Sequence, residues 1–257
     1  MARMRIIKIT KTISKLAMLG GLALASGCSS DEDGEPAAGA GGTGGAAAEK
    51  AQVRVLHLSP DAPGVDVFVN GGKDPAVENL AFTKGTAYLA VPAGAYTFDV
   101  AATGSSAADA VLTIEALSLA AGASYTAVAL DELSSITALP LVDDYSNLAS
   151  GKIRIRAVHA AAAVGQVDIW NVTDPASPTA LYQNVDFGAA GQALDVPAGA
   201  YKLGIDVNDD KKPDLTFSIP SLPAGTVANV FAVNDAAGVV FLLAELRDGS
   251  TVRIDAQ

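Results

Sequence analysis

The chain has 257 residues, with 28 acidic and 17 basic side chains and a formal net charge of −11. A chain this acidic repels nucleic acid and anionic lipid head groups, and it has no stripe of interleaved basic and aromatic residues. We therefore expect no nucleic-acid partner. Cys28 is the single cysteine, which excludes an intramolecular disulfide and any metal site built from several cysteines.

Residues 1–27 are typical of a secretory signal peptide. Residues 1–15 carry five basic side chains and no acidic one, and residues 16–24 form an apolar run too short to span a bilayer. Ala25-Ser26-Gly27-Cys28 resembles the lipobox of bacterial lipoproteins, although its leucine stands one position early. The resemblance implies cleavage before Cys28 and acylation of that residue with chains such as palmitate. The alternative is an ordinary signal peptide followed by an incidental cysteine.

Residues 28–50 are predicted to be a flexible tether, because glycine, alanine and acidic residues dominate and no large apolar side chain is present. Ser29, directly after Cys28, resembles the sorting pattern for the outer membrane of diderm bacteria. We therefore expect a lipid-anchored protein of the cell envelope, at the outer membrane. Without residues 1–27, 12 basic residues remain against 28 acidic ones, which gives a net charge of −16.

From residue 51 onward the pattern predicts an all-β fold. Short runs such as 53–58, 65–69 and 124–130 are alternating or wholly apolar, with β-branched and aromatic residues inside them. Glycine, proline, aspartate and asparagine separate these runs, and no segment keeps a period of 3.6 residues. Many short strands with regular turns indicate a sandwich or a barrel.

An internal repeat divides this β-rich part. Three segments recur at offsets of 102 to 105 residues: 54–69 as 156–171, 82–96 as 187–201, and 119–129 as 222–232. A unit of about 100 residues is the usual size of an independent domain. We therefore predict two tandem domains, 51–149 and 150–257, with a hinge at 143–151 and a separate core in each.

These segments also carry a family resemblance. "VRVLHLSPDAPGVDVFVNG", "VPAGAYTFDV" and "LAAGASYTAVAL" in the first unit, with "RAVHAAAAVGQVDIW" and "VPAGAYKLGIDV" in the second, resemble the bacterial domain-of-unknown-function family 4397. Its members are typically secreted or lipid-anchored envelope proteins, often with tandem copies. The resemblance implies two β-sandwich domains of immunoglobulin or transthyretin type, and it implies no activity.

We expect two structural histidine–aspartate pairs: His57 with Asp66, and His159 with Asp168. A hairpin would bring Asp66 close to His57, whose strand face looks like a core face. A catalytic reading needs a nucleophile such as Ser59, and the second unit has Ala161 at that place. Because the pairs recur without the loop between them, each histidine is expected to satisfy a buried aspartate.

Residues 206–215 form the one stretch with metal-ligand spacing. Four oxygen-bearing side chains fall at positions 1, 3, 5 and 9: Asp206, Asn208, Asp210 and Asp214. This spacing resembles calcium loops of bacterial surface proteins, since Ca²⁺ takes six to eight oxygen ligands. Lys211, however, stands where glycine favours the sharp turn. Two interpretations remain, a structural calcium site and a polar hairpin turn, and the turn is favoured. We expect no other cofactor.

The sequence therefore predicts a lipid-anchored envelope protein of two β-sandwich modules, with a non-catalytic binding, adhesive or scaffolding role. Its partner would be extracellular or periplasmic. The alternative is a hydrolase acting on envelope or extracellular polymers. Two repeat-equivalent histidines and the lack of a Gly-x-Ser-x-Gly sequence count against the hydrolase, so we expect no enzyme activity.

Overall fold

The computed structural model describes residues 49–257, which form one compact unit. The predicted signal peptide, Cys28 and nearly all of the predicted tether lie outside the described residues. The described part is all-β, as predicted, and its strands form four sheets. Among residues 49–257 no helix has the length and apolar character needed to cross a membrane.

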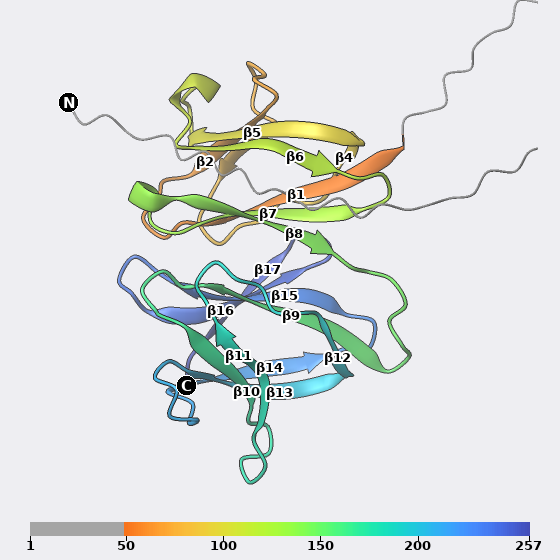
Figure 1. Cartoon of the computed structure of the whole chain (residues 1–257), viewed down its shortest axis with the longest axis vertical. Helices are drawn as coiled ribbons and strands as arrows, with labels where there is room; N and C mark the ends of the chain where they lie inside the picture. Colours follow the sequence, from red (N-terminus) through yellow and green to blue (C-terminus); the bar gives the residue numbers. More distant parts are fainter. Residues whose placement is uncertain (1–48) are drawn as a thin grey trace, which may run out of the picture. The chain divides into compact units, whose positions relative to one another are not determined.

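The first sandwich consists of two four-stranded sheets (Figure 1). Its strands are β1 (Lys50–Leu58), β2 (Val65–Val69), β3 (Val77–Leu80), β4 (Leu89–Pro92), β5 (Gly94–Ala102), β6 (Leu112–Leu119), β7 (Ser124–Leu130) and β8 (Thr137–Asp143). Two short 3-10 helices, η1 (Ala107–Asp109) and η2 (Leu133–Ser135), lie in its loops. The inner sheet has the order β4-β1-β7-β8 and the outer sheet β3-β2-β5-β6. Strands β1 and β7 run parallel, whereas all other neighbours in these two sheets are antiparallel.

The second sandwich repeats this order of strands and adds one. Its strands are β9 (Lys152–Ala160), β10 (Val167–Asn171), β11 (Thr179–Val185), β12 (Leu194–Pro197), β13 (Gly199–Asp206), β14 (Leu215–Leu222), β15 (Val227–Asn234), β16 (Val240–Leu246) and β17 (Thr251–Asp255). The inner sheet has the order β12-β9-β15-β16-β17 and the outer sheet β11-β10-β13-β14. Strands β9 and β15 are the parallel pair here. The repeat seen in the sequence is therefore also a repeat of topology.

The repeated segment "VPAGAY" makes the turn from β4 to β5 and from β12 to β13. The hydroxyl of Tyr96 donates a hydrogen bond to the carbonyl oxygen of Pro92, at 2.8 Å. Tyr201 makes the same contact with Pro197, at 2.5 Å. The tyrosine thus ties the start of one strand to the end of the strand before it, which gives the repeated tyrosine a structural role in the turn.

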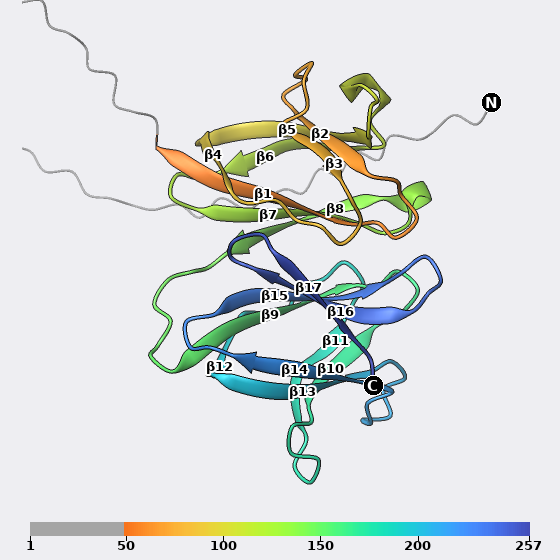
Figure 2. The ribbon, with the colours of Figure 1, turned by 180° about the vertical axis from the view of Figure 1, so that it is seen from behind.

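The two inner sheets pack against each other, so the four sheets lie as successive layers (Figures 1 and 2). Each sandwich has its own apolar core, as predicted from the sequence. A third cluster lies between the sandwiches and includes Leu56, Val158, Phe231 and Phe241. The prediction of two separate cores was therefore incomplete, because it did not include this shared one.

Strand β1 shows how one strand serves two of these cores. Val53 and Val55 face the core of the first sandwich, whereas Leu56 and Leu58 belong to the cluster between the sandwiches. A strand buried on both faces is a nearly continuous apolar run rather than an alternating one. This double burial explains the composition of "VRVLHL", and β9 follows the same plan.

Replacing Leu56 with alanine is expected to destabilise the second sandwich as well as the first. The cavity left in the shared cluster should lower the free energy of unfolding by about 2–5 kcal/mol. Trp170, the single tryptophan, lies on β10 of the second sandwich and reports its unfolding by fluorescence. In urea, the fluorescence midpoint of Leu56→Ala should fall together with the circular dichroism midpoint.

The exposed Val142, replaced with alanine, is the control for this experiment, and its midpoints should stay at wild-type values. A Leu56→Ala protein that keeps the wild-type fluorescence midpoint would show that the two sandwiches unfold separately.

Candidate functional site

The two histidines occupy the same place in the two sandwiches and are fully buried. Nε2 of His57 lies 3.1 Å from the carbonyl oxygen of Pro63, and the amide of Ser59 donates to Nδ1 at 3.4 Å. The ring of His159 makes the same two contacts with the loop that follows β9, at 2.7 and 3.4 Å. Each ring therefore fastens the end of a strand to the next loop.

These contacts require neutral rings. Burial lowers the pKa of both His57 and His159, with the backbone carbonyl contacts opposing the shift. Since Nδ1 accepts an amide hydrogen, the ring proton is assigned to Nε2, which donates to the carbonyl. Phe82 and Phe187 pack edge-on against the two rings. Both imidazoles are thus held as structural groups between loop and core.

The structure does not pair the histidines with the aspartates, which corrects the expectation from the sequence. Oδ1 of Asp66 accepts the amide of Asn79 at 2.7 Å, and Oδ2 accepts the amide of Gly104 at 2.9 Å. These bonds lower the pKa of Asp66. Asp168 likewise accepts the amide of Asn184, at 2.7 Å. Because Val65 and Val67 face the core, the side chain of Asp66 between them points the other way.

Ser59, the hydroxyl considered as a nucleophile, is not arranged for catalysis. Its side chain is fully buried, and its Oγ has no hydrogen-bond partner within residues 49–257. Its amide, rather than its hydroxyl, contacts His57. Asp61 in the same loop accepts the amide of Leu133 at 2.7 Å, so this loop is braced against η2. The polar loop of the first sandwich therefore has a local structural role.

The acidic loop between β13 and β14 directs its carboxylates toward its own backbone. Asp206 is 1% exposed and accepts three amides, those of Asn208 at 3.1 Å, Asp209 at 2.9 Å and Lys211 at 2.8 Å. Lys211 has a φ of 65°, so it adopts the left-handed conformation that glycine would favour at this position of the turn.

The side chains of the other three predicted ligands also form hydrogen bonds within this loop. Asp214 accepts the amide of Val207 at 2.9 Å and the side-chain amide of Asn208 at 3.0 Å, and Asp210 accepts the amide of Lys212 at 2.9 Å. Within residues 49–257, no group of three or more histidine, cysteine or acidic side chains is placed to hold a metal ion. The geometry is that of a turn capped by its own side chains, and calcium binding stays a prediction.

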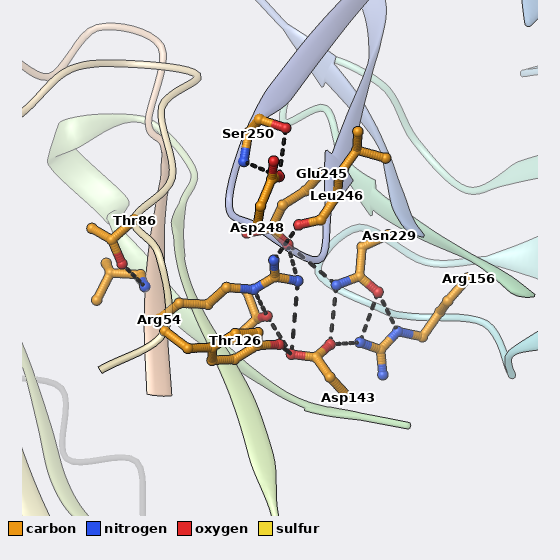
Figure 3. Close-up of polar contacts among 12 residues, drawn as sticks. Arg54, Thr86, Thr126, Asp143, Arg156, Asn229, Glu245, Leu246, Asp248 and Ser250 are labelled. Carbon is orange, nitrogen blue, oxygen red and sulfur yellow. Dashed lines mark hydrogen bonds and ion pairs between the residues drawn. The ribbon is translucent and has the colours of Figure 1, made fainter. Parts of the chain in front are cut away.

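A polar network that the sequence analysis did not single out lies at the contact between the inner sheets (Figure 3). Arg54 on β1 is 1% exposed, and its guanidinium reaches across to the second sandwich. Its Nη2 lies 2.9 Å from Oε2 of Glu245 on β16, and its Nη1 donates to the carbonyl oxygen of Leu246. Within its own sandwich, Nε donates to Oγ1 of Thr126 at 2.8 Å.

Arg156 on β9 makes the reciprocal contact. Its Nη2 lies 2.7 Å from Oδ1 of Asp143 on β8, and its Nη1 donates to the carbonyl oxygen of Val142 at 2.7 Å. Arg156 lies beside Asn229 in register, as Arg54 lies beside Thr126. Each arginine therefore binds an acid and a backbone carbonyl of the other sandwich, as in a self-complementary two-fold interface.

Asp143 and Asn229 join the two halves of this network. Oδ2 of Asp143 accepts the hydroxyls of Thr126 at 2.5 Å and Tyr88 at 2.6 Å. The amide of Asn229 donates to Asp143 at 3.1 Å and to Glu245 at 3.2 Å. Burial, followed by the bond to Asp143, raises the pKa of Tyr88. The network is thus a continuous polar chain beside an apolar cluster.

The connection between the sandwiches is fastened to this network and is not a free hinge. The hydroxyls of Tyr145 and Tyr88 lie 2.7 Å apart. Arg154 donates to the carbonyl oxygen of Ser146 at 2.7 Å and also pairs with Asp144 and Asp195. A cavity of about 70 Å³ remains here, lined in part by Arg54, Asp143, Arg154 and Arg156 and in part by apolar residues. Each of its three guanidinium groups is already paired with a carboxylate.

At pH 8, where Glu245 is ionised, a double-mutant cycle on Arg54 and Glu245 is expected to give a large coupling energy. Removing Arg54 alone should cost about 3–5 kcal/mol, because a buried carboxylate loses its partner. Removing both should cost less than the sum of the single changes. Urea unfolding of Arg54→Ala, Glu245→Ala and the double variant measures this coupling.

The cycle on Arg154 and Asp195 is the matched control, since the side chain of Asp195 is 35% exposed whereas both partners of the Arg54–Glu245 pair are fully buried. Its coupling should be much smaller, because water screens exposed ion pairs. Equal couplings for the two pairs would contradict the role assigned to burial.

Asp206→Ala is expected to lower the free energy of unfolding by about 1–3 kcal/mol, because three amides of the turn lose their acceptor. Asp210→Ala, which removes the acceptor of a single exposed amide, should have a much smaller effect. For a self-capped turn, the wild-type chain should melt at the same temperature in millimolar CaCl₂ and in EDTA. A higher melting temperature in calcium, abolished by Asp206→Ala, would instead establish a calcium site.

Residues 51–170 match the model of a family described as Domain of unknown function (DUF4397). The matched segment covers the first sandwich and extends to Trp170 on β10 of the second. No curated protein matches the chain. The match supports the DUF4397 family for this segment of the chain, and that family brings no assigned activity with it.

Proposed function

We propose that the chain is a lipid-anchored envelope protein whose two sandwiches act as one rigid, non-catalytic module for binding, adhesion or scaffolding. The observation that carries this proposal is the reciprocal contact of Arg54 and Arg156 across the inner sheets. A buried ion pair adds little net stability over apolar packing, but it penalises other arrangements of the same surfaces. The contact therefore favours a fixed spacing of the two sandwiches.

The side chains considered for catalysis support the same proposal. Both histidines bond to backbone groups of their own loops, and the hydroxyl of Ser59 is buried away from them. The carboxylates of Asp66, Asp168 and Asp206 are occupied by amides. These bonds give each group a structural use, so a binding or scaffolding role requires no further assumption about them.

We also infer that residues 150–257 are a second copy of the domain that the family model matches. The two sandwiches share their strand order, the parallel pair of inner strands and the two histidine contacts. They also share the arginine that faces the other sandwich. This set of shared features supports duplication of one domain followed by divergence of its loops.

The lipid anchor rests on the sequence around Cys28, which precedes the described residues. We predict that the wild-type chain is recovered in the membrane fraction and is labelled by a palmitate analogue. Cys28→Ser should be unlabelled and soluble, because its hydroxyl cannot replace the lipidated thiol. Ser29→Ala, which keeps Cys28, is the control and should be labelled like the wild type. Labelling of Cys28→Ser to the wild-type extent would contradict the anchor.

A binding role is tested with the soluble Cys28→Ser chain and isolated envelopes of cells that lack the protein. Co-sedimentation should be saturable, since a specific partner offers a finite number of sites. Failure to co-sediment, or binding that rises linearly without saturation, would contradict the proposal. Release of soluble fragments from the envelopes in proportion to added protein would favour the hydrolase instead.

A further inference from the structure

The carboxylate of Glu245 is the poorest-satisfied charged group in the contact between the inner sheets. Its side chain is fully buried, and both of its donors, Arg54 and Asn229, bind the same oxygen, Oε2. Oε1 has no hydrogen-bond partner within the described part of the chain. Burying a charged oxygen without a donor is costly, and adding a proton removes the charge.

Asp143, the other acid of this contact, receives more hydrogen bonds than Glu245. Asp143 receives four donors, from Arg156 and Asn229 on one oxygen and from Thr126 and Tyr88 on the other. Two buried acids share one network here, and Asp143 receives four donors whereas Glu245 receives two. A proton entering the network is therefore expected on Glu245.

The origin of this imbalance is visible in the register of the strands. Asn229 on β15 lies opposite Glu245, whereas Thr126, at the same place in the first sandwich, lies opposite Leu141. Leu141 belongs to the apolar cluster between the sandwiches. Glu245 thus stands where the first sandwich has an apolar residue, which explains why one of its oxygens meets no donor.

The groups that act on Glu245 come from several elements around it: Arg54 on β1, Asp143 on β8, Arg156 on β9, Asn229 on β15 and Tyr145 in the linker. Thr126, Tyr88 and Asp248 are coupled to the same network through Asp143 and Arg54. Strand β17 places the uncharged Thr251 opposite Glu245. Burial, aided by Asp143, raises the pKa of Glu245 to about 7, with Arg54, Asn229 and Arg156 opposing the shift. Its protonation therefore changes near neutral pH.

We propose that Glu245 makes the contact between the two sandwiches depend on protons, so that the inner sheets hold each other more tightly when Glu245 is protonated. Opening the contact or unfolding the chain returns Glu245 to water and to its ordinary acidity. The docked form therefore binds the extra proton, and Arg54 then keeps Asp143, at 3.9 Å, as its counter-charge and the carbonyl oxygen of Leu246 as an acceptor. Its stabilising effect is complete below about pH 4.5 and is lost as the pH rises through about 7.

Hydrogen exchange of the soluble Cys28→Ser chain tests this proposal. After correction for intrinsic rates, exchange in β1 and β16 should increase roughly tenfold between pH 6 and pH 8.5, the change expected for one carboxyl with these two pKa values. Glu245→Gln, which keeps the shape without the charge, should abolish most of this increase. Glu115→Gln, on the exposed face of β6, is the matched control and should keep it.

Comparing the exchange rates of wild type and variants at each pH cancels the effect of other titrating groups. His57 and His159, buried as neutral rings, destabilise the fold below about pH 6.5, which is the opposite slope. Both are present in all three proteins, so the difference between wild type and Glu245→Gln isolates Glu245. Equal pH dependence in these two proteins would overturn the proposal.

A second measurement tests the proposal without relying on the Glu245→Gln protein, in case that variant does not fold. Carbon-13 NMR of the glutamate carboxyls in the otherwise native chain should show one group titrating near neutral pH. Titration of all glutamates near their ordinary value, about 4.3, would overturn the proposal independently of any substitution at Glu245.

Discussion

Burial of both faces of the inner sheets is the constraint on which the rest of the molecule depends. Strands β1 and β9 each supply apolar side chains to their own sandwich and to the cluster between the sandwiches. Most side chains on these strands must therefore suit an interior, whichever way they point. The constraint explains why two small sandwiches, each of a size that often folds alone, form one compact unit.

Close packing of the apolar cluster already disfavours sliding of one inner sheet past the other, because interdigitated side chains would have to leave their places. The two arginines add a directional constraint to this contact. A shift of one inner sheet past the other would leave the buried Arg54 without Glu245 and the buried Asp143 without Arg156, and an unpaired buried charge is strongly destabilising. The tyrosine and arginine contacts of the linker act in the same direction, since they fasten the connecting segment to this network.

The fold class and the repeat were predictable from the sequence because strand length, turn residues and spacing are local signals. The shared core was not, since an apolar run does not say which surfaces bury its two faces. The role of the arginines could have been predicted, because Arg54 and Arg156 recur at the same spacing as the histidines. An arginine inside a mostly apolar strand indicates a buried partner. Histidine and aspartate were paired wrongly because their spacing places them on adjacent strands without showing which way each side chain points.

The reciprocal contact also limits where a partner can bind. The inner faces are occupied by each other, and the edge beside β16 is taken by β17, while Pro140 stands on the free edge of β8 and lacks the amide that an added strand would need. The surfaces that remain are the edges of β4, β12 and β17, the outer sheets and the loops. Loop 59–64 is braced against η2 in the first sandwich, and loop 207–214 caps itself in the second. The two sandwiches thus share their topology and their inner-sheet contact, while their loops differ.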